Sequence, residues 1–260
     1  MTLPVPRKST ASHFYKYSSP NHLEWLKDIL LKHELYMPNL TELNDDNDGL
    51  PRLAIQSEDE MASFIYRQFV KNNPDVSREE LQKNELIIRF NVRKHGPAAL
   101  HPNLVKSLDA QLKDFRVYSM TKRYDLINLW ALYAGGHRGY CLEFENVGDL
   151  FEHAKDVSYL DSDKMEISIT DPALLGGYFL FCKTRNWSNE DEVRLVLARN
   201  DGRTKVRFNP YWLTRIILGK EMSEVDKEQI REWAKQRDPE LTVADAYYDA
   251  ALRAIKLREQ

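Results

Sequence analysis

The chain has 260 residues, and its composition, 42% hydrophobic and 30% charged, is ordinary for a globular protein with a sizeable core. A formal net charge of −3 gives no general attraction to nucleic acid or to an anionic membrane, so binding to either would need a local basic patch. Residues 1–8 lack the apolar core of a signal peptide, and the longest apolar run, near 174–182, is too short to span a bilayer. With only Cys141 and Cys182 present, we expect a cytoplasmic protein with reduced thiols and no membrane contact.

The first elements are expected to be a strand, a helix and a second strand. Residues 1–12 are rich in Pro, Ser and Thr and should form a loose arm, after which the aromatic segment 14–17 predicts a short strand. Asn21 and Glu24 match a capping box, which predicts that a helix begins here. The second strand is expected at 35–37.

The next part of the chain predicts mostly helix. Ser57 and Ser77 each stand three residues before a glutamate, the spacing of a capping box. With the apolar periodicity that follows, this predicts helices over 58–72, 78–94 and 102–114. The span 50–114 is therefore expected to be a helical insertion or lid on a single domain covering 1–260.

Strand patterns dominate the remainder, at 115–119, 140–144, 157–159, 206–208 and 215–219. Helices are expected at 126–134 and from a cap at Ser223 to Gln236, whereas the run 174–183 and the segment after Leu241 fit either strand or helix. The order of elements predicts an α+β fold: a mixed, largely antiparallel, split sheet with flanking helices and a helical insertion near 50–114.

One candidate strand, 187–197, carries two acids at alternate positions. Alternation places Glu190, Glu192 and Arg194 on one face, with an apolar back formed by Val193, Leu195 and Leu197. Such a strand could hold paired acids toward a cleft, which suits acid–base or cation-stabilising chemistry. The other interpretation is a surface strand with a local ion pair.

Several motifs taken together resemble a bacterial family of unknown function, number 2971. The family pattern has Lys-Tyr near the start, an Asn-Asp pair, an aromatic block before Gly-x-Cys-x-Glu-Phe, and Lys followed by Trp-x-x-Glu-x-Glu-x-Arg. These fall on Lys16-Tyr17, Asn44-Asp45, Trp130–Phe144 and Lys183–Arg194. The chain departs from the pattern at Leu132, where the family often has His, and at Asp46, where it often has Pro.

The order of elements is also similar to the layout of ADP-ribosyltransferases, which hold NAD in a split-sheet cleft. The Gly-rich dinucleotide loop that those enzymes lack is absent here too. This resemblance implies NAD as co-substrate, no metal, and a macromolecular acceptor, protein or nucleic acid. It is compatible with a toxin or antiphage effector that has an antitoxin or chaperone as partner.

The resemblance also implies roles for particular residues. Glu192 would stabilise the positive charge that develops on the ribose, and Glu190 would orient or deprotonate the acceptor, while Asp191 points away. Lys16 or Arg194 could meet the pyrophosphate. The remaining candidates would stack on the ligand or hold its ribose or amide: Tyr17, Trp130, Tyr133 and Ser119.

Each of these residues also has a simpler interpretation. Trp130 and Tyr133 lie on a helical apolar stripe and could be core residues. The role of Arg194 could be no more than an ion pair with Glu192. Lys16 could be solvated, and Ser119 could cap the next helix.

Two other functions remain open from the sequence. The segment Asn44–Gly49 begins like a calcium loop, but Ile55 stands where that loop needs Glu, so a complete EF-hand is excluded. Asp45 and Asp48, with a distant glutamate, could instead bind the metal ion of a metal-dependent nuclease. Alternatively, the chain is a non-catalytic module whose helices over 58–114 bind a partner.

Overall fold

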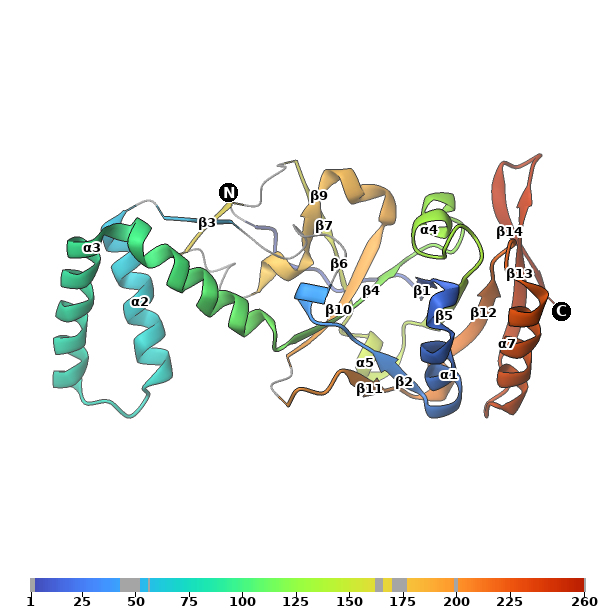
Figure 1. Cartoon of the computed structure of the whole chain (residues 1–260), viewed down its shortest axis with the longest axis horizontal. Coiled ribbons are helices and arrows are strands. Elements are labelled where there is room, and N and C mark those ends of the chain that lie inside the picture. The colour runs from blue at the N-terminus through green and yellow to red at the C-terminus, as the bar shows by residue number, and fades with distance from the viewer. Residues whose placement is uncertain are drawn as a thin grey trace.

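An eight-stranded sheet organises the computed structural model of this chain, which describes residues 3–42, 52–55, 57–161, 166–169, 177–198 and 201–259 (Figure 1). In spatial order its strands are β14 (Ala254–Glu259), β13 (Thr242–Asp249), β12 (Leu213–Leu218), β5 (Tyr140–Glu145), β1 (His13–Ser18), β4 (Phe115–Thr121), β10 (Glu192–Ala198) and β6 (Lys155–Asp156). Neighbours are antiparallel except β12 and β13, which are parallel. The predicted mixed, largely antiparallel sheet with flanking helices is confirmed.

The sheet is nearly divided between β1 and β4. Strand β1 pairs with β5 along its whole length, from His13↔Glu145 to Ser18↔Tyr140. It pairs with β4 only at Tyr15↔Thr121. Beyond this single bridge the two strands separate. The backbone N–H and C=O groups along their facing edges must therefore find hydrogen-bond partners among side chains or on a ligand. The split falls between two halves of the sheet that are otherwise well paired.

The side chains of the central strand β5 alternate between the two faces of the sheet and contribute to a core on each face. Tyr140, Leu142 and Phe144 belong to the larger cluster, which the helices α1 (Leu23–Lys32) and α7 (Glu224–Gln236) cover. Cys141 belongs to a smaller cluster under α4 (Ile127–Leu132). Because both faces are covered, every residue from Tyr140 to Phe144 is buried.

The helical insertion is a hairpin of α2 (Glu58–Asn72) and α3 (Arg78–Leu112) that projects from one end of the molecule (Figure 1). The Oγ atoms of Ser57 and Ser77 accept hydrogen bonds from the third residue after each, which confirms the two predicted caps. The two helices predicted over 78–94 and 102–114 form the single element α3, interrupted at Gly96 by a non-helical backbone (φ 75°, ψ 157°).

The remaining elements are shorter. Strands pair as β2 (Glu34–Tyr36) with β11 (Lys205–Arg207), β3 (Arg52–Ala54) with β8 (Glu166–Ser168), and β7 (Ser158–Leu160) with β9 (Cys182–Thr184). The only other α-helix in the described part of the chain is α5 (Gly148–Phe151). Short 3-10 turns span Pro20–His22, Leu40–Glu42, Tyr178–Phe181, Arg185–Glu190 and Pro210–Trp212.

Two local predictions near the N-terminus are wrong. The expected loose arm is anchored from residue 3 onward, because Leu3 and Ser9 are buried and the amide of Ser9 donates to the carbonyl of Ala154 at 2.9 Å. The capping box at Asn21 does not form. Instead Ser19 Oγ accepts from the amide of Asn21 and caps the preceding turn, and α1 follows directly.

Candidate functional site

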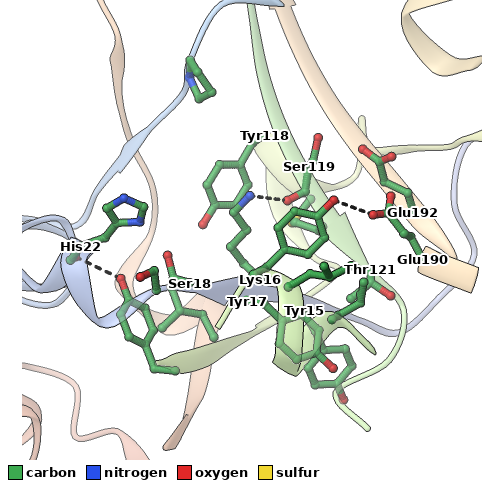
Figure 2. A pocket seen from close by; sticks show the side chains of 18 of the residues that line it. Tyr15, Lys16, Tyr17, Ser18, His22, Tyr118, Ser119, Thr121, Glu190 and Glu192 are labelled. Atoms are coloured by element: carbon green, nitrogen blue, oxygen red, sulfur yellow. Dashed lines mark hydrogen bonds between the residues drawn. The ribbon is translucent and has the colours of Figure 1, made fainter. Parts of the chain in front are cut away.

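A cavity of about 640 Å³ lies where β1 and β4 separate (Figure 2). Four consecutive residues of β1, Tyr15 to Ser18, line it together with Tyr118 to Thr121 of β4. Its other lining residues are Ser19, His22, Trp25, Ile29, Tyr36, Pro38, Glu42, Leu129, Leu132, Tyr133, Tyr140, Leu142, Lys183, Glu190 and Glu192. Its size is within the range of small-molecule sites, of about 300 to 1,000 Å³.

Glu190 and Glu192 reach this cavity by a different route from the predicted one. Glu190 is not on a strand: it ends the 3-10 turn Arg185–Glu190, Asp191 is left-handed (φ 45°), and β10 begins at Glu192. The prediction that all three acidic and basic residues alternate along one strand is therefore wrong. The turn nevertheless brings both glutamates to the cavity, while Asp191 turns to an ion pair with Lys122 at 3.2 Å.

A buried cation holds the two glutamates together. Lys183 Nζ donates to Glu190 Oε2 at 2.7 Å and to Glu192 Oε2 at 3.4 Å, and it lies 4.6 Å from the ring centroid of Trp187. The side chains of Lys183, Glu190 and Glu192 are only 6%, 8% and 5% exposed. No role for Lys183 was predicted from the sequence. Its only signal was its place as the lysine at the start of the Lys-to-Arg motif.

Arg194 forms a bidentate ion pair with Glu192. Its Nε and Nη2 atoms donate to the two carboxylate oxygens of Glu192 at 2.7 and 3.0 Å, and its Nη1 donates to the carbonyl of Leu180 at 3.0 Å. Burial disfavours the charged carboxylate, but the charge and hydrogen bonds of Arg194, with Lys183 and Ser119, lower the pKa of Glu192 to about 2. The cavity thus presents an ionised carboxylate at neutral pH.

Lys16 spans the gap between the separated strands. Its Nζ donates to the backbone carbonyl of Ser119 at 2.9 Å and lies 5.2 Å from the ring centroid of Tyr118 (Figure 2). Burial lowers the pKa of Lys16, and the nearby carboxylates of Glu192 and Glu190 oppose this shift. The lysine therefore replaces a missing strand–strand hydrogen bond while it lines the cavity.

Tyr133 connects α4 to the acids. Its hydroxyl donates to Glu190 Oε1 at 2.6 Å, so Glu190 is held by a phenol on one oxygen and by Lys183 on the other. Tyr17 also lines the cavity, but its hydroxyl donates to the carbonyl of Arg123 at 3.0 Å and accepts from the amide of Leu126 at 3.2 Å. Tyr17 therefore braces the turn between β4 and α4.

Two predicted ligand-binding residues lie outside the cavity lining. Trp130 is fully buried, its Nε1 donates to the carbonyl of Tyr124 at 2.8 Å, and its ring packs edge-on against Tyr17. Arg194 is fully buried behind Glu192. The predictions that Trp130 stacks on a ligand and that Arg194 meets a pyrophosphate are thus corrected: the core interpretation holds for the first, and the ion-pair interpretation for the second.

The far end of the cavity is aromatic and was missed by the sequence analysis. Trp25 is stacked between His22 and Tyr36, with ring centroids 4.1 and 4.9 Å away. Glu42 accepts from the hydroxyl of Tyr36 at 2.8 Å and from Asn39 Nδ2 at 2.8 Å. In Figure 2 His22 and the two glutamates lie on opposite sides of the cavity, so its two ends differ chemically. These residues come from α1, β2 and a turn, and no local pattern joins them.

Within the described ranges, no three His, Cys, Asp or Glu side chains form a group that could hold a metal ion. The acidic segment Asn44–Gly49, the basis of the nuclease interpretation, lies outside the described residues. Among the described helices, none is both long and apolar enough to cross a membrane.

Comparisons with known proteins give no relative. No family model matches the chain, and no curated protein or solved structure matches it either. The resemblance to family 2971 therefore rests on the sequence motifs alone.

Proposed function

We propose that the chain binds NAD in the cavity between β1 and β4 and transfers ADP-ribose to a nucleophilic acceptor. The observation that carries the proposal is Glu192, a carboxylate that lines the cavity at the split of the sheet and is held ionised by Arg194. A fixed negative charge is what a positively charged ribose needs as its bond to nicotinamide breaks.

In the proposed transfer, the bond between ribose C1′ and the nicotinamide nitrogen breaks, and nicotinamide leaves with the bonding electrons. The acceptor's oxygen or nitrogen forms the new bond to C1′, and its proton passes to Glu190, the second acid at the cavity. Tyr133 and Lys183 hold Glu190 toward this position.

The hydrogen bonds of Glu192 leave one contact that a ligand could replace. Its oxygens accept from Arg194 at 2.7 and 3.0 Å and from Lys183 at 3.4 Å. A carboxylate accepts about four hydrogen bonds, so these three nearly fill the set. The long contact to Lys183 is the weakest, and a ribose hydroxyl would take its place.

Lys16 and the aromatic end favour a ligand that is both anionic and aromatic. Lys16 presents its ammonium group in the cavity between the acids and Tyr118. An ammonium group suits a phosphate, and the tyrosines that line the cavity suit flat rings with polar edges.

The test uses the purified full chain with and without millimolar NAD. A ligand that binds only the folded state must raise the thermal midpoint, so we expect an NAD-dependent rise and slow release of nicotinamide. Glu192→Gln should lower the rate of release by a factor on the order of 10² to 10³, as loss of a transition-state charge does elsewhere.

Asp191→Asn is the matched control, because Asp191 adjoins both glutamates but pairs with Lys122 on the outside, with its side chain 43% exposed. It should keep both NAD binding and nicotinamide release. Wild type that neither responds to NAD nor releases nicotinamide would refute the proposal. So would a folded Glu192→Gln variant as active as wild type.

A further inference from the structure

The first half of α3, before the break at Gly96, has one face that is not packed against the protein. Val92 is buried and Ile88 half-buried, and both belong to the cluster that this helix shares with Met61 and Phe64 of α2. In Figure 1 this half of α3 lies at the end of the molecule, far from the sheet and its cavity. The opposite face of the helix is therefore directed outward.

This outward face carries large apolar side chains. Leu86 is 70% exposed, Phe90 65% and Ile87 45%. Leu86 and Phe90 are four residues apart, so they lie next to each other along the helix, with Ile87 beside them. Single exposed apolar residues need no explanation, but three in contact range on one helix face form a patch.

Basic residues border the patch. Lys83 precedes Leu86 by three residues and Ile87 by four, and Arg93 and Lys94 follow Phe90 by three and four. At these spacings the three exposed basic side chains lie directly at the two ends of the apolar patch. The whole chain has a net charge of −3, so this basic cluster is a local feature and not a property of the surface as a whole.

The positions of these charges argue against a second copy of the chain as the occupant. In an antiparallel two-fold pairing that sets Leu86 of one copy against Phe90 of the other, Lys83 would face Arg93 at both ends. Like charges in these flanking positions oppose the pairing. A partner with acids in the flanking positions would instead complement both ends.

We propose that this face of α3 is a docking surface for a partner helix that carries apolar side chains between acidic ones. Leu86 and Phe90 supply the apolar anchors, and Lys83, Arg93 and Lys94 set the orientation and the preference for negative charge. The partner is thus a separate protein, and the surface lies apart from the cavity.

The test measures binding of a labelled synthetic helix, three heptads long, with Leu at the core positions and Glu at the others, to the full chain by fluorescence anisotropy. We expect saturable binding that weakens when NaCl is raised from about 50 to about 300 mM. Phe90→Ser and Arg93→Ser should each weaken it, the first by about tenfold or more. Lys71→Ser, an exposed basic residue on α2, is the matched control and should bind as wild type.

Several results would overturn the proposal: equal binding of the same helix with Lys in place of Glu, wild-type affinity of the Phe90→Ser variant, or no binding of the acidic helix at low salt. Binding of the protein to phosphatidylserine vesicles that is lost in Phe90→Ser, without binding of the acidic helix, would instead assign the patch to a membrane surface. Light scattering that shows a dimer of wild type and a monomer of Phe90→Ser would assign it to self-association.

Discussion

Replacing Lys183 by methionine tests whether the folded protein needs this buried cation to accommodate Glu190 and Glu192 at the cavity. Lys183 and Arg194 form the direct ion pairs of Glu190 and Glu192, so the substitution removes the cation that contacts both glutamates among side chains that are at most 8% exposed. At an effective dielectric of about 20, the contacts of 2.7 and 3.4 Å correspond to gross attractions of roughly 6 and 5 kcal/mol.

Two terms offset this attraction. Burying the ammonium group costs several kcal/mol, and Arg194 repels it across Glu192. We therefore expect Lys183→Met to lower the free energy of unfolding by about 3–5 kcal/mol, as loss of one partner of a buried pair does elsewhere.

The assay is urea unfolding, monitored by tryptophan fluorescence and circular dichroism. The Glu190→Gln single variant is measured in the same way for comparison. Glu190→Gln removes the carboxylate that Lys183→Met leaves without its ion pair, so the double variant should be more stable than Lys183→Met alone, with a coupling of about 1–3 kcal/mol. If Lys183→Met costs less than about 1 kcal/mol, or if the two losses simply add, the network does not hold the acids as described.

Three further outcomes are expected. The pKa of Glu192 is about 2 in the folded protein, against an ordinary value of 4.5. The ionised carboxylate therefore stabilises the folded state fully above pH 4.5, and this contribution is lost as the pH falls toward 2. Glu192→Gln should flatten that part of the curve of stability against pH. Trp130→Ala should cost about 3–5 kcal/mol in urea unfolding, whereas a folded Trp130→Phe variant should keep the NAD response of wild type. Gly139→Ala places a methyl carbon 2.0 Å from the carbonyl oxygen of Ser18. It should lower the thermal midpoint more than Gly202→Ala, where φ is positive but the added carbon meets no atom of the described residues within 4 Å. A smaller effect at Gly139 than at Gly202 would contradict this packing.

Local signals in the sequence determined much of the secondary structure. Ser57, Ser77 and Ser223 each cap a helix as their spacing to an acid three residues later predicts, because the bonds involve only neighbouring residues. The strand predicted at 140–144 is also confirmed, as part of β5. Asn21 shows the limit of this reasoning, since Ser19 Oγ accepts from the amide of Asn21, the donor that Glu24 would bind in a capping box.

The candidate site was only partly predictable. Six of the eight residues singled out from the sequence line the cavity: Lys16, Tyr17, Ser119, Tyr133, Glu190 and Glu192. The reasoning from strand alternation was nevertheless wrong for Glu190, because the left-handed turn at Asp191 breaks the strand and brings the side chain to the cavity by another path.

The sequence by itself determined that helices follow Ser57, Ser77 and Ser223 and that two acids stand close together, because these features depend on contacts a few residues apart. Only the tertiary structure decided that β1 and β4 separate beyond one residue pair, that Lys16 reaches across the gap, and that Lys183 joins the two glutamates. It also decided that Trp130 is a core residue and that Trp25 faces the cavity. The Lys16 side chain, for example, donates to the backbone carbonyl of Ser119, 103 residues further along the chain, and no local pattern records such a contact.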